Sequence, residues 1–284
     1  MSSPLVVEGM GFRLDCGTRT FIMGILNSTP DSFSDGGSFY ELEKAVAHGR
    51  QMVEDGADIL DVGGESTRPG AEEVSLDEEL RRVIPVIEAL AATLSIPLSI
   101  DTRKAEVARQ AIRAGARIVN DVSGMSMDPN MGRVVADAGT PVVLMHSKGV
   151  PKEMQQNPWY RDTVGEIKSW LGTRIEAARL AGVLHEQIII DPGIGFGKRI
   201  SDNLLILKSL NELRPLGCPI LIGPSRKSFI GHVLGGTEQD RMEGTAAAIA
   251  VGIANGAHLI RVHDVKQMAR IARMTDAILN AAQE

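Results

Sequence analysis

The sequence contains only two cysteines among its 284 residues, Cys16 and Cys218. They lie far apart in the chain, and neither belongs to a C-x-x-C pair. A disulfide framework needs several cysteines, and a structural zinc site needs closely spaced ligand pairs. The sequence therefore indicates neither kind of scaffold, which suits a protein of the reducing cytosol.

Long apolar runs and net positive charge are also missing. No run of about 18 apolar residues occurs, and residues 1–8 have no basic segment before an apolar core, so neither a membrane-spanning helix nor a secretory signal is indicated. Asp and Glu number 36 against 30 Lys and Arg, a formal net charge of −6. Surfaces that bind nucleic acid or anionic membranes need positive charge. We therefore expect a cytoplasmic protein that binds neither and that holds any anion in a local pocket.

What the sequence does contain is a junction that recurs along the chain. An amphipathic helical pattern ends in a small residue and a glycine, and an apolar β-rich run follows within a few residues. Glycine just past a helix adopts the left-handed conformation that caps the free carbonyl groups. The junction precedes five apolar runs, at residues 58–62, 117–119, 141–144, 187–190 and 258–260. It therefore indicates a series of βα units.

The helical segments have the period that such units need. Between residues 42 and 53, apolar or small residues recur at intervals of three and four, at Leu42, Ala45, Val46, Gly49, Met52 and Val53. This spacing places them on one stripe of a helix, and such a stripe packs on a sheet.

Eight strands are expected, at about residues 20–26, 58–62, 96–100, 117–119, 141–145, 187–190, 219–222 and 258–262, and a final helix at about 264–281. Eight βα units match an α/β fold of the (β/α)8 TIM barrel type, as a single domain over residues 1–284. Two glycines between Leu5–Val7 and Phe12–Leu14 add a short N-terminal β-hairpin. The alternative is an open doubly wound sheet, which gathers functional residues near one switch point.

Polar residues follow nearly every one of these apolar runs. They are Asn27, Asp61, Asp101, Asn120 with Asp121, His146, Asp191, and Arg261 with His263. A barrel brings the carboxyl ends of all its strands into one mouth. The distribution therefore favours the barrel over the open sheet.

Three of these residues, Asp101, Asn120 and Asp191, carry carboxylate or amide groups. Such groups accept and donate hydrogen bonds along the edge of a flat, nitrogen-rich ring. The alternative is that each Asp caps the following helix, and Asp101 before Thr102 is well placed for that. Lys227 could pair with Asp191 and donate to a ring carbonyl, or it could be an exposed surface lysine.

Arg261 and His263 occupy alternate positions, so on a strand both point to the same face. Both side chains bind phosphate, and with the loop at residues 63–70 they predict an anion site. The alternative for Arg261 is a salt bridge with a neighbouring carboxylate such as Asp264. The glycine-rich residues 191–198 match neither common nucleotide-binding pattern, and we interpret their glycines as room for a flat ligand near the backbone.

The loop at residues 25–37 is longer than a strand-to-helix turn requires. Asn27 stands at the strand end, and Asp31 and Asp35 add oxygen ligands, so the loop is predicted to close over an ion or an anion. The alternative is a solvated Ω-loop. No Ser-His-Asp, Cys-His or three-ligand zinc spacing stands out. The sequence therefore favours a reaction of positioning and leaving-group stabilisation, in which Mg²⁺ bridges phosphate oxygens to few protein ligands.

Seven motifs in this order resemble those of the bacterial dihydropteroate synthases of the pterin-binding family: residues 25–37, 61–70, 99–103, 120–124, 191–198, 225–229 and 261–264. The resemblance implies a TIM barrel, usually a homodimer, and a transferase of folate biosynthesis. Such an enzyme uses Mg²⁺ and condenses 6-hydroxymethyl-7,8-dihydropterin diphosphate with 4-aminobenzoate. It releases diphosphate, and it is the target of sulfonamides.

The resemblance also implies a role for individual site residues. The pterin would be held by Asp101, Asn120, Met145, Asp191 and Lys227. The diphosphate would bind to Asn27, Arg261 and His263, and Asn27 would also contact the Mg²⁺. The aminobenzoate side would consist of Phe33, Thr67, Arg68, Pro69, Phe196 and Ser228. The catalytic residues would be Asn27, Asp35, Lys227 and Arg261.

Two positions depart from the usual pattern of this family. Ser28 stands where Val is common, and Ser147 stands where Met usually follows Met145 and His146; both bear on rate or drug response more than on the reaction. One alternative is the pterin-binding domain of a corrinoid methyltransferase, against which the complete first loop and residues 225–228 argue. The other is a non-catalytic paralogue, which would not need every named residue.

Overall fold

The structure is a computed structural model that describes residues 5–28, 38–66, 71–149, 154–237 and 241–282. Its centre is a barrel of eight parallel strands. These strands are β3 (Phe21–Asn27), β4 (Ile59–Gly63), β5 (Leu98–Asp101), β6 (Ile118–Asp121), β7 (Val142–Met145), β8 (Ile188–Asp191), β9 (Leu221–Ile222) and β10 (Leu259–Val262). Every strand lies within two residues of its predicted bounds, so the predicted barrel is confirmed.

The strands follow one another around the barrel in chain order. Neighbours pair from β3 through to β8, and β10 pairs with both β3 and β9. Between β8 and β9 a parallel bridge joins Ile190 to Ile220, and the Ile190 amide donates to the carbonyl of Pro219 at 2.9 Å. These last bonds nearly close the barrel, which leaves few strand groups unpaired.

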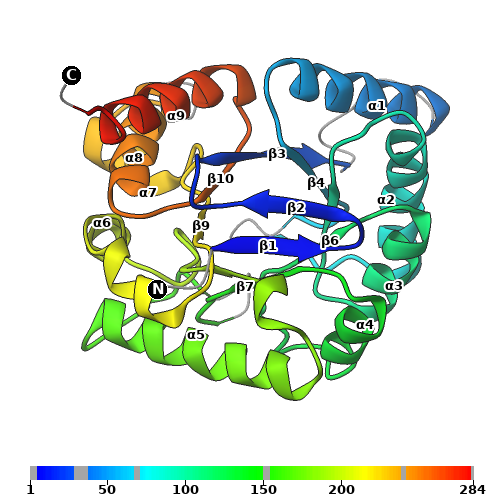
Figure 1. Ribbon diagram of the computed structural model, residues 1–284, viewed down its shortest axis with the longest axis horizontal. Coiled ribbons are helices and arrows are strands. Elements are labelled where there is room, and N and C mark those ends of the chain that lie inside the picture. The colour runs from blue at the N-terminus through cyan, green and yellow to red at the C-terminus, as the bar shows by residue number, and fades with distance from the viewer. Residues whose placement is uncertain (1–4, 29–37, 67–70, 150–153, 238–240, 283–284) are drawn as a thin grey trace.

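Helices surround the barrel on its outer side (Figure 1). They are α1 (Ser38–Glu54), α2 (Leu76–Ala91), α3 (Ala105–Ala114), α4 (Met131–Ala138), α5 (Thr163–Leu180), α6 (Ile200–Lys208), α7 (Ser228–Leu234), α8 (Met242–Ala254) and α9 (Val265–Leu279), with 3-10 helices η2 (His185–Gln187) and η3 (Leu210–Leu216). Gly139 ends α4 at φ 62° and ψ 30°, and the other four predicted junction glycines also have positive φ. None of the described helices is long and apolar enough to span a membrane.

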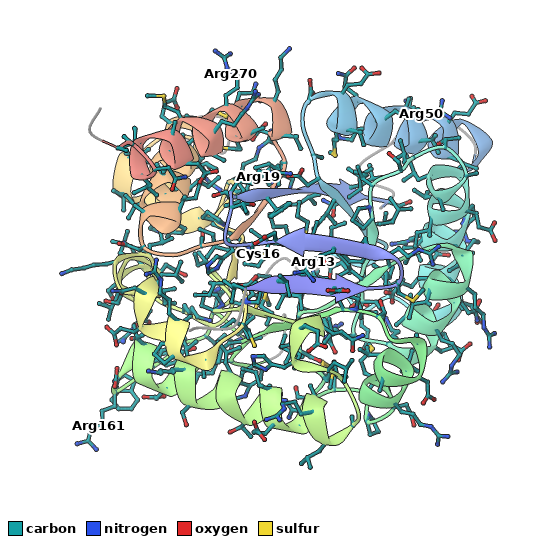
Figure 2. All side chains as sticks on the ribbon, viewed as in Figure 1. Arg13, Cys16, Arg19, Arg50, Arg161 and Arg270 are labelled. Atoms are coloured by element: carbon teal, nitrogen blue, oxygen red, sulfur yellow. The ribbon has the colours of Figure 1, made fainter. Side chains whose placement is uncertain are left out.

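The apolar residues that were predicted to line one side of each helix pack in the core between the helices and the strands. On α1, Ala45 and Met52 are buried, and Leu42, Val46 and Val53 pack against the same cluster. The opposite sides of the helices carry charge: Arg50 on α1 and Arg270 on α9 point away from the barrel into solvent (Figure 2). The apolar stripe of each helix therefore decides which side faces the sheet.

The predicted N-terminal hairpin is present and covers one end of the barrel (Figure 1). It consists of β1 (Val6–Gly9) and β2 (Phe12–Asp15), joined by a turn whose two central residues both have positive φ. Val7 and Leu14 from the hairpin pack in one cluster with inward-facing strand residues such as Met23. The hairpin thus seals the barrel at the amino ends of its strands and leaves the other end as the mouth.

Candidate active site

The barrel interior is layered along its strands. The apolar cluster under the hairpin includes one residue from each of four strands, Ile59, Ile118, Ile189 and Leu259. Residues two positions apart on a strand face the same side. Two positions further along these strands stand, in the same order, Asp61, Asn120, Asp191 and Arg261. The apolar layer is therefore followed, toward the carboxyl ends, by a polar one that lines the mouth.

Most of the predicted site residues that the structure describes meet at this mouth. Six of them hold the last or next-to-last position of a barrel strand: Asn27, Asp101, Asn120, Met145, Asp191 and Arg261. Four others lie in or directly after the next loops: Phe196, Lys227, Ser228 and His263. The remaining predicted residues lie outside the described part of the chain: Phe33, Asp35, Thr67, Arg68 and Pro69.

The Arg261 guanidinium lies between two carboxylates of other strands. Its Nε donates to Oδ2 of Asp61 at 2.6 Å, and its Nη2 donates to Oδ2 of Asp101 at 2.6 Å. Asp264, the nearest carboxylate in the chain, instead accepts two hydrogen bonds from Arg226. The alternative of an Arg261–Asp264 salt bridge is therefore wrong, and the carboxylates that Arg261 does pair with are Asp61 and Asp101. Arg261 points into the barrel, whereas Asp264 follows the strand end.

Asp61, which was not among the predicted site residues, organises this cluster. It is fully buried, and its Oδ2 also accepts a hydrogen bond from Nδ2 of Asn120 at 2.9 Å. Its Oδ1 has no hydrogen-bond partner within the described part of the chain. Asp61 is the third of the five residues of β4, and its place directly after the apolar Ile59 and Leu60 was the available signal for its importance.

Burial sets the charge state of the two carboxylates that are predicted to hold a ring. It raises the pKa of Asp101 to about 7, with the Arg261 charge opposing the shift and Asp61 adding to it. Burial also raises the pKa of Asp191 to about 6, opposed by the Gly193 amide and by the positive charges nearby. Both carboxylates therefore depend on neighbouring cations to stay ionised near neutral pH.

Neither Asp101 nor Asp191 caps a helix, which was the alternative for both. Helix α3 begins at Ala105, and the Asp101 carboxylate is bound to Arg261 instead. Oδ1 of Asp191 accepts a hydrogen bond from the Gly193 amide at 2.6 Å, within the loop that precedes α6. Both side chains are thus free of a capping role.

The glycine-rich loop after β8 packs closely against the loop after β7. A Cβ added to Gly193 would lie 1.9 Å from the carbonyl oxygen of His146, and one added to Gly197 would lie 2.2 Å from that of Lys148. Both glycines have positive φ as well. The structure thus gives these two glycines a different reason from the predicted approach of a flat ligand: they let two loops of the protein pack backbone to backbone.

Lys227 and Phe196 form one wall of the mouth. Nζ of Lys227 lies 4.1 Å from the centroid of the Phe196 ring, a cation–π distance. Phe196 packs in a small apolar cluster with Val122, Met145 and Met154. Lys227 is only partly exposed, so the reading of it as an ordinary surface lysine is not supported. An aromatic and aliphatic wall therefore stands beside the polar layer.

His263 joins the loops after β9 and β10. Its Nδ1 lies 3.0 Å from Oγ of Ser225, and its backbone amide donates to the same oxygen at 3.2 Å. The residue follows the last strand position, Val262, rather than lying within β10. It therefore stands at the rim of the mouth, further out than Arg261.

The root of the first loop is fastened to the second loop through α2. The Ser28 amide donates to the carbonyl of Gly63, and Oγ of Ser28 donates to the carbonyl of Arg82 at 3.0 Å. The Arg82 guanidinium in turn donates to the carbonyl of Gly64 at 2.9 Å. A valine at position 28 would lack the hydroxyl bond, so this departure from the usual pattern has a structural consequence.

A buried charge network holds the segment that leads into residues 67–70. The Glu65 carboxylate bonds to Arg103 and to Nζ of Lys104, and the same Nζ lies 2.6 Å from Oε2 of Glu79. Thr102 donates to the other oxygen of Glu79. Glu65 and Glu79 are almost fully buried, so each carboxylate relies on these cations. The network fixes one side of the mouth.

The comparisons with known proteins agree with one family. The family model described as pterin binding enzyme matches residues 23–263. The dihydropteroate synthase of Synechocystis sp. is 52% identical over 265 residues, which cover 93% of this chain and 92% of that one.

Two solved structures share the fold with equal TM-scores. The Yersinia pestis dihydropteroate synthase in a sulfonamide drug complex has a TM-score of 0.92 at 42% identity and covers 98% of this chain and 100% of its own. The Xanthomonas albilineans dihydropteroate synthase with 4-aminobenzoic acid has a TM-score of 0.92 at 45% identity, and the match covers 99% of this chain and 100% of that one. The chain belongs to the pterin-binding enzyme family and, within it, to the dihydropteroate synthases.

Proposed function

We propose that this protein condenses 6-hydroxymethyl-7,8-dihydropterin diphosphate with 4-aminobenzoate and releases 7,8-dihydropteroate and diphosphate, as the transferase step of folate biosynthesis. The observation that carries the proposal is the polar layer in the barrel mouth. It presents Asp101, Asn120 and Asp191 together beside Lys227 and Phe196, in a chain that matches dihydropteroate synthases over almost its whole length. We also propose that residues 1–284 act as one barrel domain in the cytoplasm.

The pterin would bind within the polar layer. The carboxylates of Asp101 and Asp191 would accept hydrogen bonds from the amino and ring N–H groups of the pterin, and Asn120 would contribute an amide. Lys227 would donate to the ring carbonyl, and Met145 would pack on the ring face. The support for this placement is that these side chains share one buried mouth. A flat ring suits a pocket with polar edges and an apolar wall.

The diphosphate would lie toward the rim, against Asn27, Arg261 and His263. Arg261 spends one N–H on each of Asp61 and Asp101, and its guanidinium has five N–H groups, so donors remain for an anion. In the described part of the chain no three His, Cys, Asp or Glu side chains gather into a metal site. The amide oxygen of Asn27 together with the diphosphate oxygens fits Mg²⁺, which takes one or two protein oxygens beside substrate phosphates and water. Asn27, half-buried at the end of β3, would hold it through its amide oxygen.

The aminobenzoate would bind between the Phe196 wall and the segment at residues 67–69. Phe196 and the exposed Ser228 at the start of α7 would contact it from one side, and Thr67, Arg68, Pro69 and Phe33 from the other. The buried Glu65 network supports this placement, because it fixes the backbone that leads into residue 67.

The reaction would be dissociative. The bond between the exocyclic carbon and the diphosphate oxygen breaks while the pterin ring shares the positive charge, and the amine nitrogen of 4-aminobenzoate then attacks that carbon. When bound, Mg²⁺ supplies charge neutralisation for the departing diphosphate. Lys227, Arg261 and Asn27 position the reacting groups, and Asp35 joins them from the first loop. No strong base is needed, because the arylamine attacks in its neutral form and the nitrogen, positively charged once the new bond has formed, then loses one proton to water or to the departing diphosphate.

We further propose that the protein is a homodimer joined through α8. This helix is apolar along nearly its whole length, and Ala247, Val251 and Ala254 on one of its sides are exposed. The neighbouring helices α6 and α7, which contact α8, add exposed Leu204 and Leu234 to the same region. A helix that is apolar all round is normally covered. A second copy of the chain would cover this one.

The assay for the activity is the formation of 7,8-dihydropteroate by the purified protein. We expect product from the pterin diphosphate, 4-aminobenzoate and Mg²⁺ together, and none when any one of the three is omitted. A protein that binds the pterin but forms no product would instead be a non-catalytic relative.

Lys227→Ala and Arg261→Ala should each lower kcat/KM by about a hundredfold or more, because each removes a charged donor to substrate. Arg261→Ala should also lower the midpoint of thermal unfolding, because it leaves Asp61 and Asp101 buried without their shared cation. Steady-state kinetics and thermal melts measure the two effects. Lys266→Ala on the exposed side of α9 is the control, and near wild-type turnover in either site variant would refute the assignment.

Asn27→Ala and Asp35→Ala should separate the fixed part of the first loop from the part that closes. Asn27→Ala should weaken binding of the pterin diphosphate and lower turnover, because Asn27 stands at a strand end. Asp35→Ala should lower turnover more than binding. Calorimetry and steady-state kinetics measure the difference, and equal losses of binding in both variants would mean that the loop is not a lid.

Val251→Glu should convert a dimer to a monomer, because it buries a carboxylate in the proposed interface. Sedimentation velocity measures the mass. Leu180→Glu is the matched control, because Leu180 is also an exposed apolar residue but lies at the end of α5. A monomeric wild type, or a dimer that survives Val251→Glu, would contradict the proposed interface.

A further inference from the structure

Lys198 is a charged residue that the proposed reaction does not use and that the fold buries. Only 3% of its surface is exposed. Its Nζ lies 3.0 Å from Nδ1 of His146, 3.3 Å from the carbonyl oxygen of His146 and 3.0 Å from the carbonyl oxygen of Phe196. Three acceptors match the three N–H groups of an ammonium, whereas a neutral amine has only two. The geometry therefore suits a positively charged lysine.

His146 is arranged to accept the hydrogen bond from Lys198. Its ring packs edge-on against Trp170 at 5.0 Å between centroids, and burial together with the Lys198 charge lowers its pKa to about 2. A neutral imidazole accepts at one ring nitrogen. His146 therefore stays neutral, and it ties the loop after β7 to the loop after β8 through Lys198.

Lys198 and Asp191 meet at the same residue, His146: Nζ of Lys198 lies 3.3 Å from the His146 carbonyl oxygen, and the His146 amide donates to the carbonyl of Asp191 at 2.9 Å. The charge of Lys198 acts from there on the carboxylate of Asp191. Burial lowers the pKa of Lys198 to about 7, and Asp191 is the foremost charge that opposes this, followed by Asp202. Asp202 already bonds to Arg199 and Thr163. Lys227 and Lys148 act on Lys198 in the opposite sense. Asp191 is thus the acidic group for which the Lys198 charge is most needed.

The ionised state of Asp191 in turn depends on nearby cations. Lys198, Lys227 and Arg261 are the cations that lower its pKa against the effect of burial. Arg261 is shared with Asp61 and Asp101, and Lys227 lies over the Phe196 ring in the partly exposed wall. Lys198 is the most deeply buried of the three, where solvent screens its field least.

We propose that Lys198 is a positioning residue, which keeps Asp191 ionised for pterin binding and holds Phe196 in place without touching the substrate. The inference rests on the proposed function, since it assigns Asp191 to the pterin. An ionised Asp191 accepts hydrogen bonds from the donor edge of the ring, whereas a protonated one would direct an O–H toward that edge. Loss of the Lys198 charge would therefore weaken pterin binding most on the acidic side.

The test is the pH dependence of pterin affinity in Lys198→Met. Calorimetry with 6-hydroxymethyl-7,8-dihydropterin avoids the titration of phosphate groups. Wild-type affinity should fall as the pH drops through the pKa of Asp101, about 7, and then through that of Asp191, about 6. Without the cation the pKa of Asp191 rises, so in Lys198→Met the Asp191 step should shift about one pH unit higher or more, and well below pH 6 the affinity should be about tenfold weaker than in the wild type.

Two variants separate charge from packing. Lys198→Arg keeps the charge, so the low-pH part of its curve of pterin affinity against pH, the acidic limb, should stay near that of the wild type. Tyr160→Phe removes the bond from Tyr160 Oη to the carbonyl of Gly197 at 2.9 Å, so it loosens the same loop without changing a charge. It should lower the unfolding midpoint and leave the acidic limb in place. Lys198→Gln provides a second neutral variant if Lys198→Met does not fold.

Each outcome decides the proposal. An acidic limb that is unchanged in the neutral variants, or that shifts equally in Tyr160→Phe, would overturn it. So would the failure of both neutral variants to fold, since Lys198 would then be a purely structural residue. A wild-type protein that binds no pterin at any pH would instead refute the proposed function.

Discussion

The structure depends on how positive charge is supplied to carboxylates inside a barrel. Asp61, Asp101 and Asp191 are buried on three strands in the polar layer of the barrel, and an isolated buried carboxylate is too costly to remain ionised. Arg261 reaches two of them at 2.6 Å each, which joins strands β4, β5 and β10 across the mouth. Because that cation is shared, the third carboxylate needs a cation of its own.

The period of the strands explains why these charges meet where they do. Inward-facing positions alternate along each strand, so an apolar layer and a polar layer can follow each other two residues apart. The hairpin β1–β2 covers the apolar layer and closes that end to solvent. Water and ligands therefore reach the interior from the mouth, where donors and acceptors already stand in fixed positions. Such preorganisation serves a reaction that requires placement more than proton transfer.

Much of this arrangement follows from local patterns in the sequence. Glycines after helices and apolar runs of strand length predicted the eight strands, and the polar residues at their ends predicted which side chains meet. The partners were not predictable, because Arg261 bonds to residues 200 and 160 positions away rather than to its neighbour Asp264. The packing of Gly193 and Gly197 against the preceding loop is also invisible in a linear motif, as is the burial of Lys198. Contacts between distant strands decide these features, and local spacing does not report them.

The most direct test of this view is a crystal structure of the protein with 6-hydroxymethyl-7,8-dihydropterin bound. The donor edge of the ring should face Asp101 and Asp191 in the polar layer, with its carbonyl toward Lys227 and with Arg261 still joined to Asp61. A pterin bound outside the barrel mouth, or one that displaces Arg261 from both carboxylates, would contradict the idea that the buried charges are set in advance for this ligand.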